Sequence, residues 1–139
     1  MATTTTKKSP AKKKGLTAEE RWAVGELELI MKNDAPLYYH LTSTWYNNYA
    51  KKKARGTFDR EAALKGLANS FCSQAITFYN KQYGKYGRTI RLSKEAKAEF
   101  AKIALRELYE CGLKNVRKGS KPKEHTIPDM HRNNIWRYI

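Results

Sequence analysis

Acidic residues, cysteines and long apolar runs are all scarce in this sequence. Its 139 residues include 13 Asp and Glu against 28 Lys and Arg, and only two cysteines. No apolar run approaches the length of a membrane span or of a signal-peptide core, so we expect no membrane protein. Cys72 and Cys111 have apolar neighbours, which is typical of core residues in a reducing compartment. We therefore expect a cytoplasmic or nucleoid-associated location, inside the host cell if the protein is viral and nuclear if it is eukaryotic.

Sequence patterns that carry catalysis or hold a cofactor are also lacking. No paired carboxylates, no nucleophile with a base and no phosphate-binding glycine loop occurs at a recognisable spacing. His125, Asp129 and His131 form the only local cluster with metal-ligand chemistry, but structural zinc sites usually use four ligands. We therefore expect no enzyme, no metal and no cofactor.

Positive charge is concentrated at the two ends of the chain. Residues 1–16 carry 5 Lys and no acid, residues 17–112 carry 16 Lys and Arg against 11 acids, and residues 113–139 carry 7 against 2. Each part therefore contributes +5 to the net charge of +15, although the ends are far shorter. This distribution predicts a helical domain over 17–112, a disordered basic arm over 1–16 and a basic tail over 113–139, and it favours a polyanion partner, DNA or RNA above all.

Hydrophobic periodicity predicts an all-α fold, a small bundle of about four helices. Apolar residues recur at three- and four-residue spacing over 17–33, 36–55, 57–83 and 94–111. In the first segment the predicted stripe comprises Trp22, Ala23, Leu27, Ile30 and Met31. Thr17 with Glu20 is a capping box, and Ser93 is a helix cap. The aromatic end of the chain is expected to dock on the protein's own core or on a partner, through Ile135, Trp136, Tyr138 and Ile139.

The junction between the second and third segments is the strongest candidate site. Lys51, Lys52, Lys53 and Arg55 lie at the end of one helix, Gly56 can close that helix, and Thr57 can cap the next. The free N–H groups of a helix start, flanked by cations, predict a phosphate site. The alternative is that these cations only surround the solvent-exposed end of a helix and bind no ligand.

Further basic and aromatic residues are candidates for the same partner. We expect Lys85, Arg88 and Arg91 to extend the patch and Lys12, Lys13 and Lys14 to wrap the nucleic acid. Tyr39, Tyr46 and Tyr86 lie near cations in the sequence and could stack on bases. Tyrosine also fills small helical cores without any ligand, so a structural role for these three residues stays open.

Two parts of the sequence resemble known protein groups. The first carries several short motifs in a fixed order: L-Y, K-K-x-x-G-T-F-D, F-Y-x-K-x-Y-G and a later Arg before an alanine-rich helix. The matching residues are Leu37, Tyr38, Lys52, Lys53, Gly56, Phe58, Asp59, Ala63, Tyr79, Lys81, Arg91 and Ala98. This part resembles short helical proteins of unassigned function in tailed-phage genomes, which implies a phage or bacterial setting and no particular active site. Ser9-Pro10-Ala11-Lys12 resembles the S-P-x-K repeats of linker-histone tails, which implies contacts with DNA phosphates and minor grooves.

The function predicted from these patterns is phosphate-directed, weakly sequence-specific nucleic-acid binding, in an architectural or regulatory role. A helix-turn-helix formed by the second and third segments would add sequence-specific contacts, although its second helix starts with acids. The main alternative is a phage structural or host-interaction protein that binds an acidic protein surface, with the aromatic C-terminus as its anchor.

Overall fold

The computed structural model describes residues 16–87 and 89–126, and this part of the chain folds as four helical rods without a strand. The first rod is α1 (Ala18–Asn33) and the last is α6 (Lys94–Glu110). The second comprises α2 (Ala35–His40), the π-helical turn η1 (Leu41–Tyr46) and α3 (Asn47–Arg55). The third comprises α4 (Arg60–Gly66), the π-helical turn η2 (Leu67–Phe71) and α5 (Cys72–Tyr83). Short 3-10 turns, η3 (Gly84–Tyr86) and η4 (Leu113–Asn115), follow α5 and α6. The predicted all-α bundle is confirmed.

Two of the helix starts are made by the side chains that the sequence indicated. Thr17 Oγ1 accepts a hydrogen bond from the Glu20 N–H at 3.1 Å, and the Thr17 N–H donates to Glu20 Oε1 at 3.1 Å. Ser93 Oγ accepts from the Ala96 N–H at 3.2 Å. Each bond satisfies an amide that has no partner inside the helix, which fixes where α1 and α6 begin.

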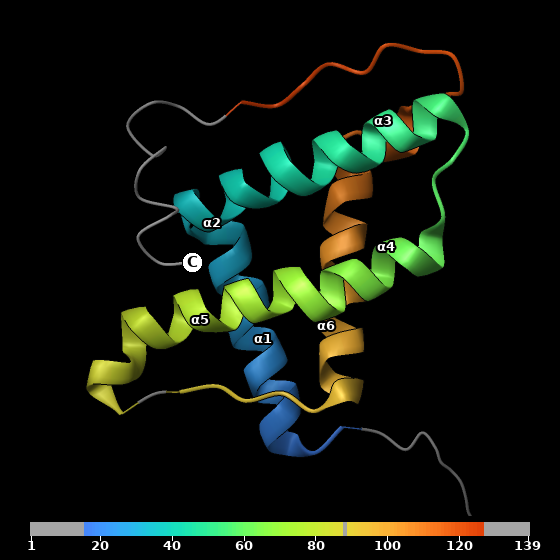
Figure 1. Cartoon of the computed structure of the whole chain (residues 1–139). Helices are drawn as coiled ribbons and strands as arrows, with labels where there is room; N and C mark the ends of the chain where they lie inside the picture. Colours follow the sequence, from blue (N-terminus) through green and yellow to red (C-terminus); the bar gives the residue numbers. More distant parts are fainter. Residues whose placement is uncertain (1–15, 88, 127–139) are drawn as a thin grey trace, which may run out of the picture.

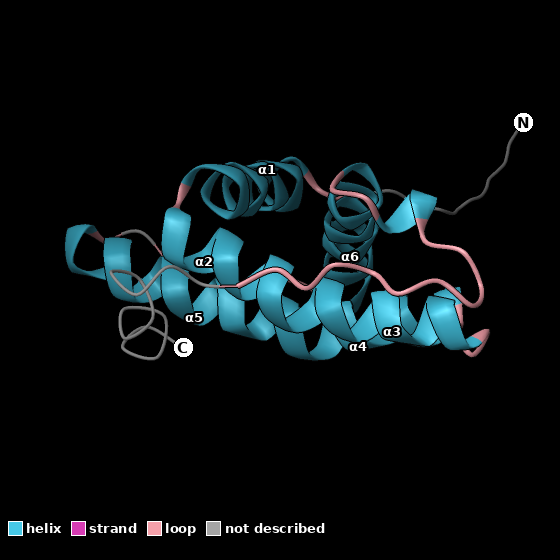
Figure 2. Ribbon diagram, turned by 90° about the horizontal axis from the view of Figure 1, so that it is seen from above, coloured by secondary structure: helices cyan, strands magenta, loops and turns pink. Residues whose placement is uncertain are grey.

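The rods form two layers (Figure 1, Figure 2). The second and third rods lie side by side in opposite directions, and α1 and α6 cross behind them in the other layer. A helix-turn-helix needs two helices at about 90–120° joined by a short turn. The α3–α4 corner instead joins an antiparallel helical hairpin, so the helix-turn-helix alternative is wrong.

The core lies between the two layers and is rich in aromatic rings. Phe71 from η2 and Phe100 from α6 stack with their ring centroids 5.9 Å apart, and both side chains are fully buried. Trp22 departs from the predicted apolar stripe because it points away from the core and is 47% exposed. No helix of the described residues is both long and apolar enough to cross a membrane.

The two π-helical turns meet where the rods of the hairpin pack together. The Trp45 ring from η1 lies edge-on to Phe71 at 6.0 Å, and His40 Nε2 lies 2.7 Å from Gln74 Oε1 on the facing rod. A π-helical turn widens the helix by one residue and re-aims the side chains that follow it. An aromatic contact between the two rods therefore lies at the π-helical turns.

Candidate nucleic-acid interface

The α3–α4 corner differs from the predicted one in how the second helix starts. Gly56 closes α3 in the left-handed conformation, with φ of 79°, as expected. Thr57 does not cap α4, because its N–H and hydroxyl both donate to the Lys52 carbonyl, at 2.8 and 3.3 Å. Asp59 is the cap, and its carboxylate accepts from the Glu61 N–H at 3.2 Å. A carboxylate therefore occupies the helix start at which a phosphate was expected.

The four predicted cations of α3 have unequal roles. Lys53 is half-buried, and its ammonium donates to the Leu113 carbonyl at 2.8 Å and lies 5.9 Å from the centre of the Tyr109 ring. That contact holds the segment after α6 against α3, so Lys53 is mainly structural. Lys51 pairs with Glu124 at 3.0 Å, while Lys52 and Arg55 are exposed at the surface.

The segment 117–126, here called the strap, runs back along α3 (Figure 2). Its first anchor is the Gly119 N–H, which donates to the Ala54 carbonyl at 2.7 Å. Beside it the Lys118 side chain lies against Gly56, where a Cβ would be 3.1 Å from Lys118 Cε. The sequence predicted only a basic tail over 113–139, because the Gly, Ser, Pro and Lys residues of this segment predict no packing.

The far end of the strap is fastened by a side-chain amide. Asn47 Nδ2 donates to the His125 carbonyl at 2.8 Å, and the His125 N–H donates to Asn47 Oδ1 at 2.9 Å. The His125 ring also lies edge-on to Tyr46, with centroids 4.4 Å apart. Because both bonds reach the main chain of residue 125, they fix the path of the strap and leave its lysine side chains free of this role.

Together α3 and the strap form a strongly cationic surface, here called the basic strap face. Its members are the exposed residues Lys51, Lys52, Arg55, Arg117, Lys118, Lys121 and Lys123. Glu124 is the single acid within 47–58 and 113–126, a region that also contains Lys53 and Lys114 and so holds nine cations. Four of the seven members were not predicted as site residues. The high charge of 113–139 was the signal for them, but only the anchored strap places them beside α3.

The second predicted group of cations lies elsewhere. Lys85 is in η3, at the end of the third rod remote from the α3–α4 corner (Figure 1). Arg60 to Tyr83 spans 24 helical residues, and this places the two ends about 36 Å apart. Arg91 is exposed in the loop before α6, after Ile90, whose N–H donates to Asn80 Oδ1 at 2.8 Å. Lys85 and Arg91 therefore do not extend the basic strap face.

Of the three predicted stacking residues, only Tyr86 is exposed at the surface. Tyr46 is 5% exposed beneath His125 and Gly112, so its predicted stacking on a base is wrong. Tyr39 is half-buried on α2. Tyr86 is 71% exposed, but it lies in η3 with the Lys85 ammonium 5.3 Å from its ring centre. The exposed large aromatic side chains among the described residues are Trp22, Tyr83 and Tyr86, and none of them belongs to α3 or to the strap.

Several predicted residues lie outside the part of the chain that the structure describes. They are Lys12, Lys13, Lys14, Arg88, Asp129, His131, Ile135, Trp136, Tyr138 and Ile139. Of the predicted metal cluster, only His125 is described, and it packs on Tyr46. Within 16–87 and 89–126, no three side chains of His, Cys, Asp or Glu come together to hold a metal ion.

One small polar cluster lies between α2 and the end of α6. Tyr38 Oη lies 2.9 Å from Cys111 Sγ and donates to Glu107 Oε2 at 3.1 Å. Burial raises the pKa of the Cys111 thiol and also that of the Tyr38 hydroxyl. Both groups are therefore protonated near neutral pH, and the thiol is a poor nucleophile in this setting.

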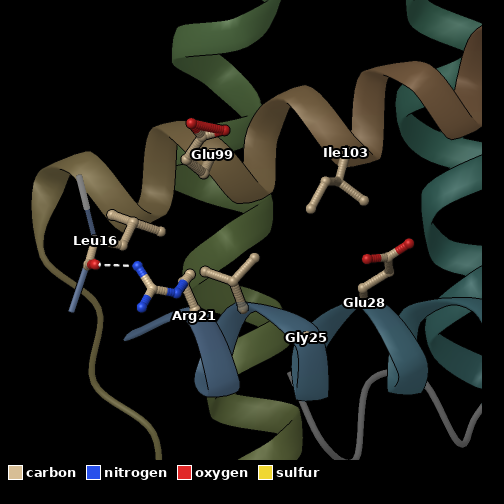
Figure 3. Close-up of a pocket in the computed structure, with 7 residues that line it drawn as sticks. Leu16, Arg21, Gly25, Glu28, Glu99 and Ile103 are labelled. Atoms are coloured by element: carbon tan, nitrogen blue, oxygen red, sulfur yellow. Dashed lines mark hydrogen bonds between the residues drawn. The ribbon is translucent and has the colours of Figure 1, made fainter. Parts of the chain in front are cut away.

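A groove of about 460 Å³ lies between α1 and α6 (Figure 3). Its walls are mainly apolar, and its charged groups are Arg21, Glu28 and Glu99. The Arg21 guanidinium donates to the Leu16 carbonyl at 2.6 Å, which ties down the start of α1. With two carboxylates against one cation, this groove is unsuited to a phosphate backbone.

The chain matches no protein-family model, and it has no significant match among curated proteins or solved structures.

Proposed function

We propose that this protein binds the phosphate backbone of nucleic acid through the basic strap face. The observation that carries the proposal is the anchored strap, which sets the cations of 117–126 beside those of α3. Seven exposed cations on one surface, with a single carboxylate among them, create a positive potential that attracts a polyanion. Contacts of lysine and arginine with phosphates carry no sequence information, so binding through phosphates alone is weakly sequence-specific.

The form of nucleic acid follows from the side chains that this surface lacks. Single-strand binders combine cations with exposed rings on which bases stack. Neither α3 nor the strap exposes a large aromatic side chain, so the surface offers phosphate contacts alone. We therefore infer that a duplex, whose phosphates form a dense and regular row, binds at least as tightly as a single strand of the same length.

The experiment is a mobility-shift series with matched charge removal. One variant changes Lys52, Arg55 and Lys121 to Ala on the basic strap face. The control changes Lys65, Lys81 and Lys94 to Ala, three exposed lysines on other surfaces, so both variants lose the same charge. Lys53 and Lys51 are left intact because the first bonds Leu113 and the second pairs with Glu124. Single- and double-stranded DNA and RNA are each titrated at low and at higher salt.

The two variants separate a site from a general charge effect. If three phosphate contacts are lost, the slope of log K against log salt becomes shallower by about 2.7 in the first variant and changes little in the control. Equal loss in both variants would contradict a defined site. No binding by the unmodified chain would instead favour an acidic protein as partner, the alternative that the sequence also allows.

The terminal segments extend the proposal. Lys12, Lys13 and Lys14 precede α1 by only a few residues, and we propose that they add phosphate contacts beyond the basic strap face. Deletion of residues 1–15 is expected to weaken binding and to reduce its salt dependence. An unchanged affinity after this deletion would limit the interface to α3 and the strap.

A further inference from the structure

Helix α1 carries a second apolar stripe on the side opposite its core stripe. Trp22 is 47% exposed and Leu29 is 58% exposed, although both are large apolar side chains. They lie seven residues apart, and at about 100° per residue their directions differ by only about 20°. The buried Leu27 points about 140° away from Trp22. The two exposed side chains thus lie on the same solvent-facing side of the helix.

Two small residues complete this outward stripe. Ala18 is exposed, and a Cβ added at Gly25 would meet nothing within 4 Å. Positions 18, 22, 25 and 29 are spaced four, three and four residues apart, which is the a/d spacing by which one helix packs on another. A surface helix usually has one apolar stripe, and a helix that is apolar on two sides is usually covered on both.

We propose that this stripe packs against α1 of a second copy of the chain, with the two helices antiparallel. In the register that sets Trp22 opposite Gly25 of the second copy, Leu29 lies opposite its Ala18. Every large side chain then meets a small one, and a two-fold axis repeats both pairs. Such ridge-into-gap pairing permits a close approach of the two helices.

Charge supports a second copy as the occupant. Arg21 and Glu28 lie on the edge of α1 that faces α6 (Figure 3). Antiparallel pairing brings Arg21 of each copy near Glu28 of the other, which also pairs with Lys32 of its own helix at 2.7 Å. Helix α1 also holds four acids against two cations in a chain of net charge +15. Two such basic molecules therefore repel each other less at α1 than at other surfaces.

The expected dimer is weak and leaves the basic strap face open. One helix pair buries less than the roughly 1,200 Å² of a stable interface, and Glu19 and Glu26 on the other edge of α1 oppose like charges. We therefore expect a dissociation constant in the micromolar range. Because α1 lies in the other layer from α3 (Figure 2), dimerisation and nucleic-acid binding use separate surfaces. The test below is made without nucleic acid, so its outcome is independent of the proposed function.

The test is sedimentation velocity of the full-length chain from about 1 to about 200 µM. We expect a monomer–dimer equilibrium in which Trp22→Ala and Gly25→Gln each raise the dissociation constant at least about tenfold. Gly25→Gln has room on the isolated helix and improves its helix propensity, so it fills the gap without harming the monomer. Tyr86→Ala, which removes an exposed ring outside α1, is the matched control and should leave the dissociation constant of the dimer unchanged.

The orientation is tested by exchanging the flanking charges. Glu28→Arg should weaken the dimer, and the double variant Arg21→Glu with Glu28→Arg should restore it. A chain that is monomeric throughout, or a dimer that tolerates both Trp22→Ala and Gly25→Gln, overturns the proposal. A failed rescue overturns it when the double variant melts at the temperature of the unmodified chain, because Arg21→Glu also removes the bond to the Leu16 carbonyl. Dimerisation that appears only after deletion of residues 133–139 also overturns it, and assigns the stripe to the chain's own C-terminal segment.

Discussion

Releasing the strap from α3 without changing any charge should weaken nucleic-acid binding. Asn47→Ala removes the two hydrogen bonds to the main chain of His125, at 2.8 and 2.9 Å, which fasten the far end of the strap. Hydrogen bonds of this kind contribute about 0.5–1.5 kcal/mol each, so strap docking should lose about 1–3 kcal/mol. The population of the undocked strap should then rise between about 5- and 150-fold.

Hydrogen exchange measures this release directly. The Gly119 amide bonds the Ala54 carbonyl only while the strap is docked, so its exchange should accelerate by that same factor. Global melting is a poorer assay, because alanine is a better helix former than asparagine and masks part of the loss. Asn48→Ala has the same propensity gain at an exposed neighbouring position and serves as the control. Unchanged Gly119 exchange in Asn47→Ala would show that this end of the strap is held by its own contacts, and would refute docking of the strap as one unit. Unchanged DNA affinity despite faster exchange would show that binding does not need the docked strap.

Three further predictions concern stability. Gly112→Ala should destabilise the fold by more than about 2 kcal/mol in thermal melts, because the φ of Gly112 is 131° and a Cβ would lie 2.9 Å from Tyr46 Oη. Gly25→Ala, where a Cβ meets nothing within 4 Å, should instead stabilise the fold by about 0.5–1 kcal/mol. Lys53→Ala should cost about 1.5–3 kcal/mol in urea unfolding by removing the bond to the Leu113 carbonyl, and a loss no larger than that of Lys52→Ala would deny Lys53 its structural role. Burial lowers the pKa of His40 below its usual 6.5, so the unfolded chain takes up a proton at a higher pH than the folded chain does, and stability should fall as pH drops below about 6.5. His40→Gln should flatten this pH dependence of the melting temperature between about pH 7.5 and 5.5. An equal slope in the variant would refute the role given to His40.

Local sequence signals predicted the helices but not the way they are interrupted. Capping at Thr17 and Ser93 and the closing Gly56 follow from interactions within a few residues, which a sequence pattern can display. The π-helical turns η1 and η2 depend on packing between rods at Trp45 and Phe71, which sequence spacing does not reveal. Thr57 failed as a cap because Asp59, two residues later, provides a carboxylate for the same purpose.

The candidate site was predicted only in part, because some of its residues come together only through tertiary contacts. The cations of α3 are adjacent in sequence and were found, whereas the strap residues join them only through tertiary contacts such as Asn47 with His125. Trp22 was predicted to share the apolar stripe with Leu27 and Ile30, but periodicity alone does not distinguish a core stripe from a second, outward one. Tyr46 was proposed for stacking from its nearness to lysines in the sequence, yet its ring packs beneath the strap.

The salt dependence of duplex DNA affinity tests the central claim most directly. If the basic strap face and the terminal segments neutralise about six to eight phosphates, a plot of log K against log salt should have a slope between about −5 and −7, and affinity should fall by roughly three to four decades from 50 to 200 mM. A slope near zero, or no measurable binding in dilute buffer, would contradict the account.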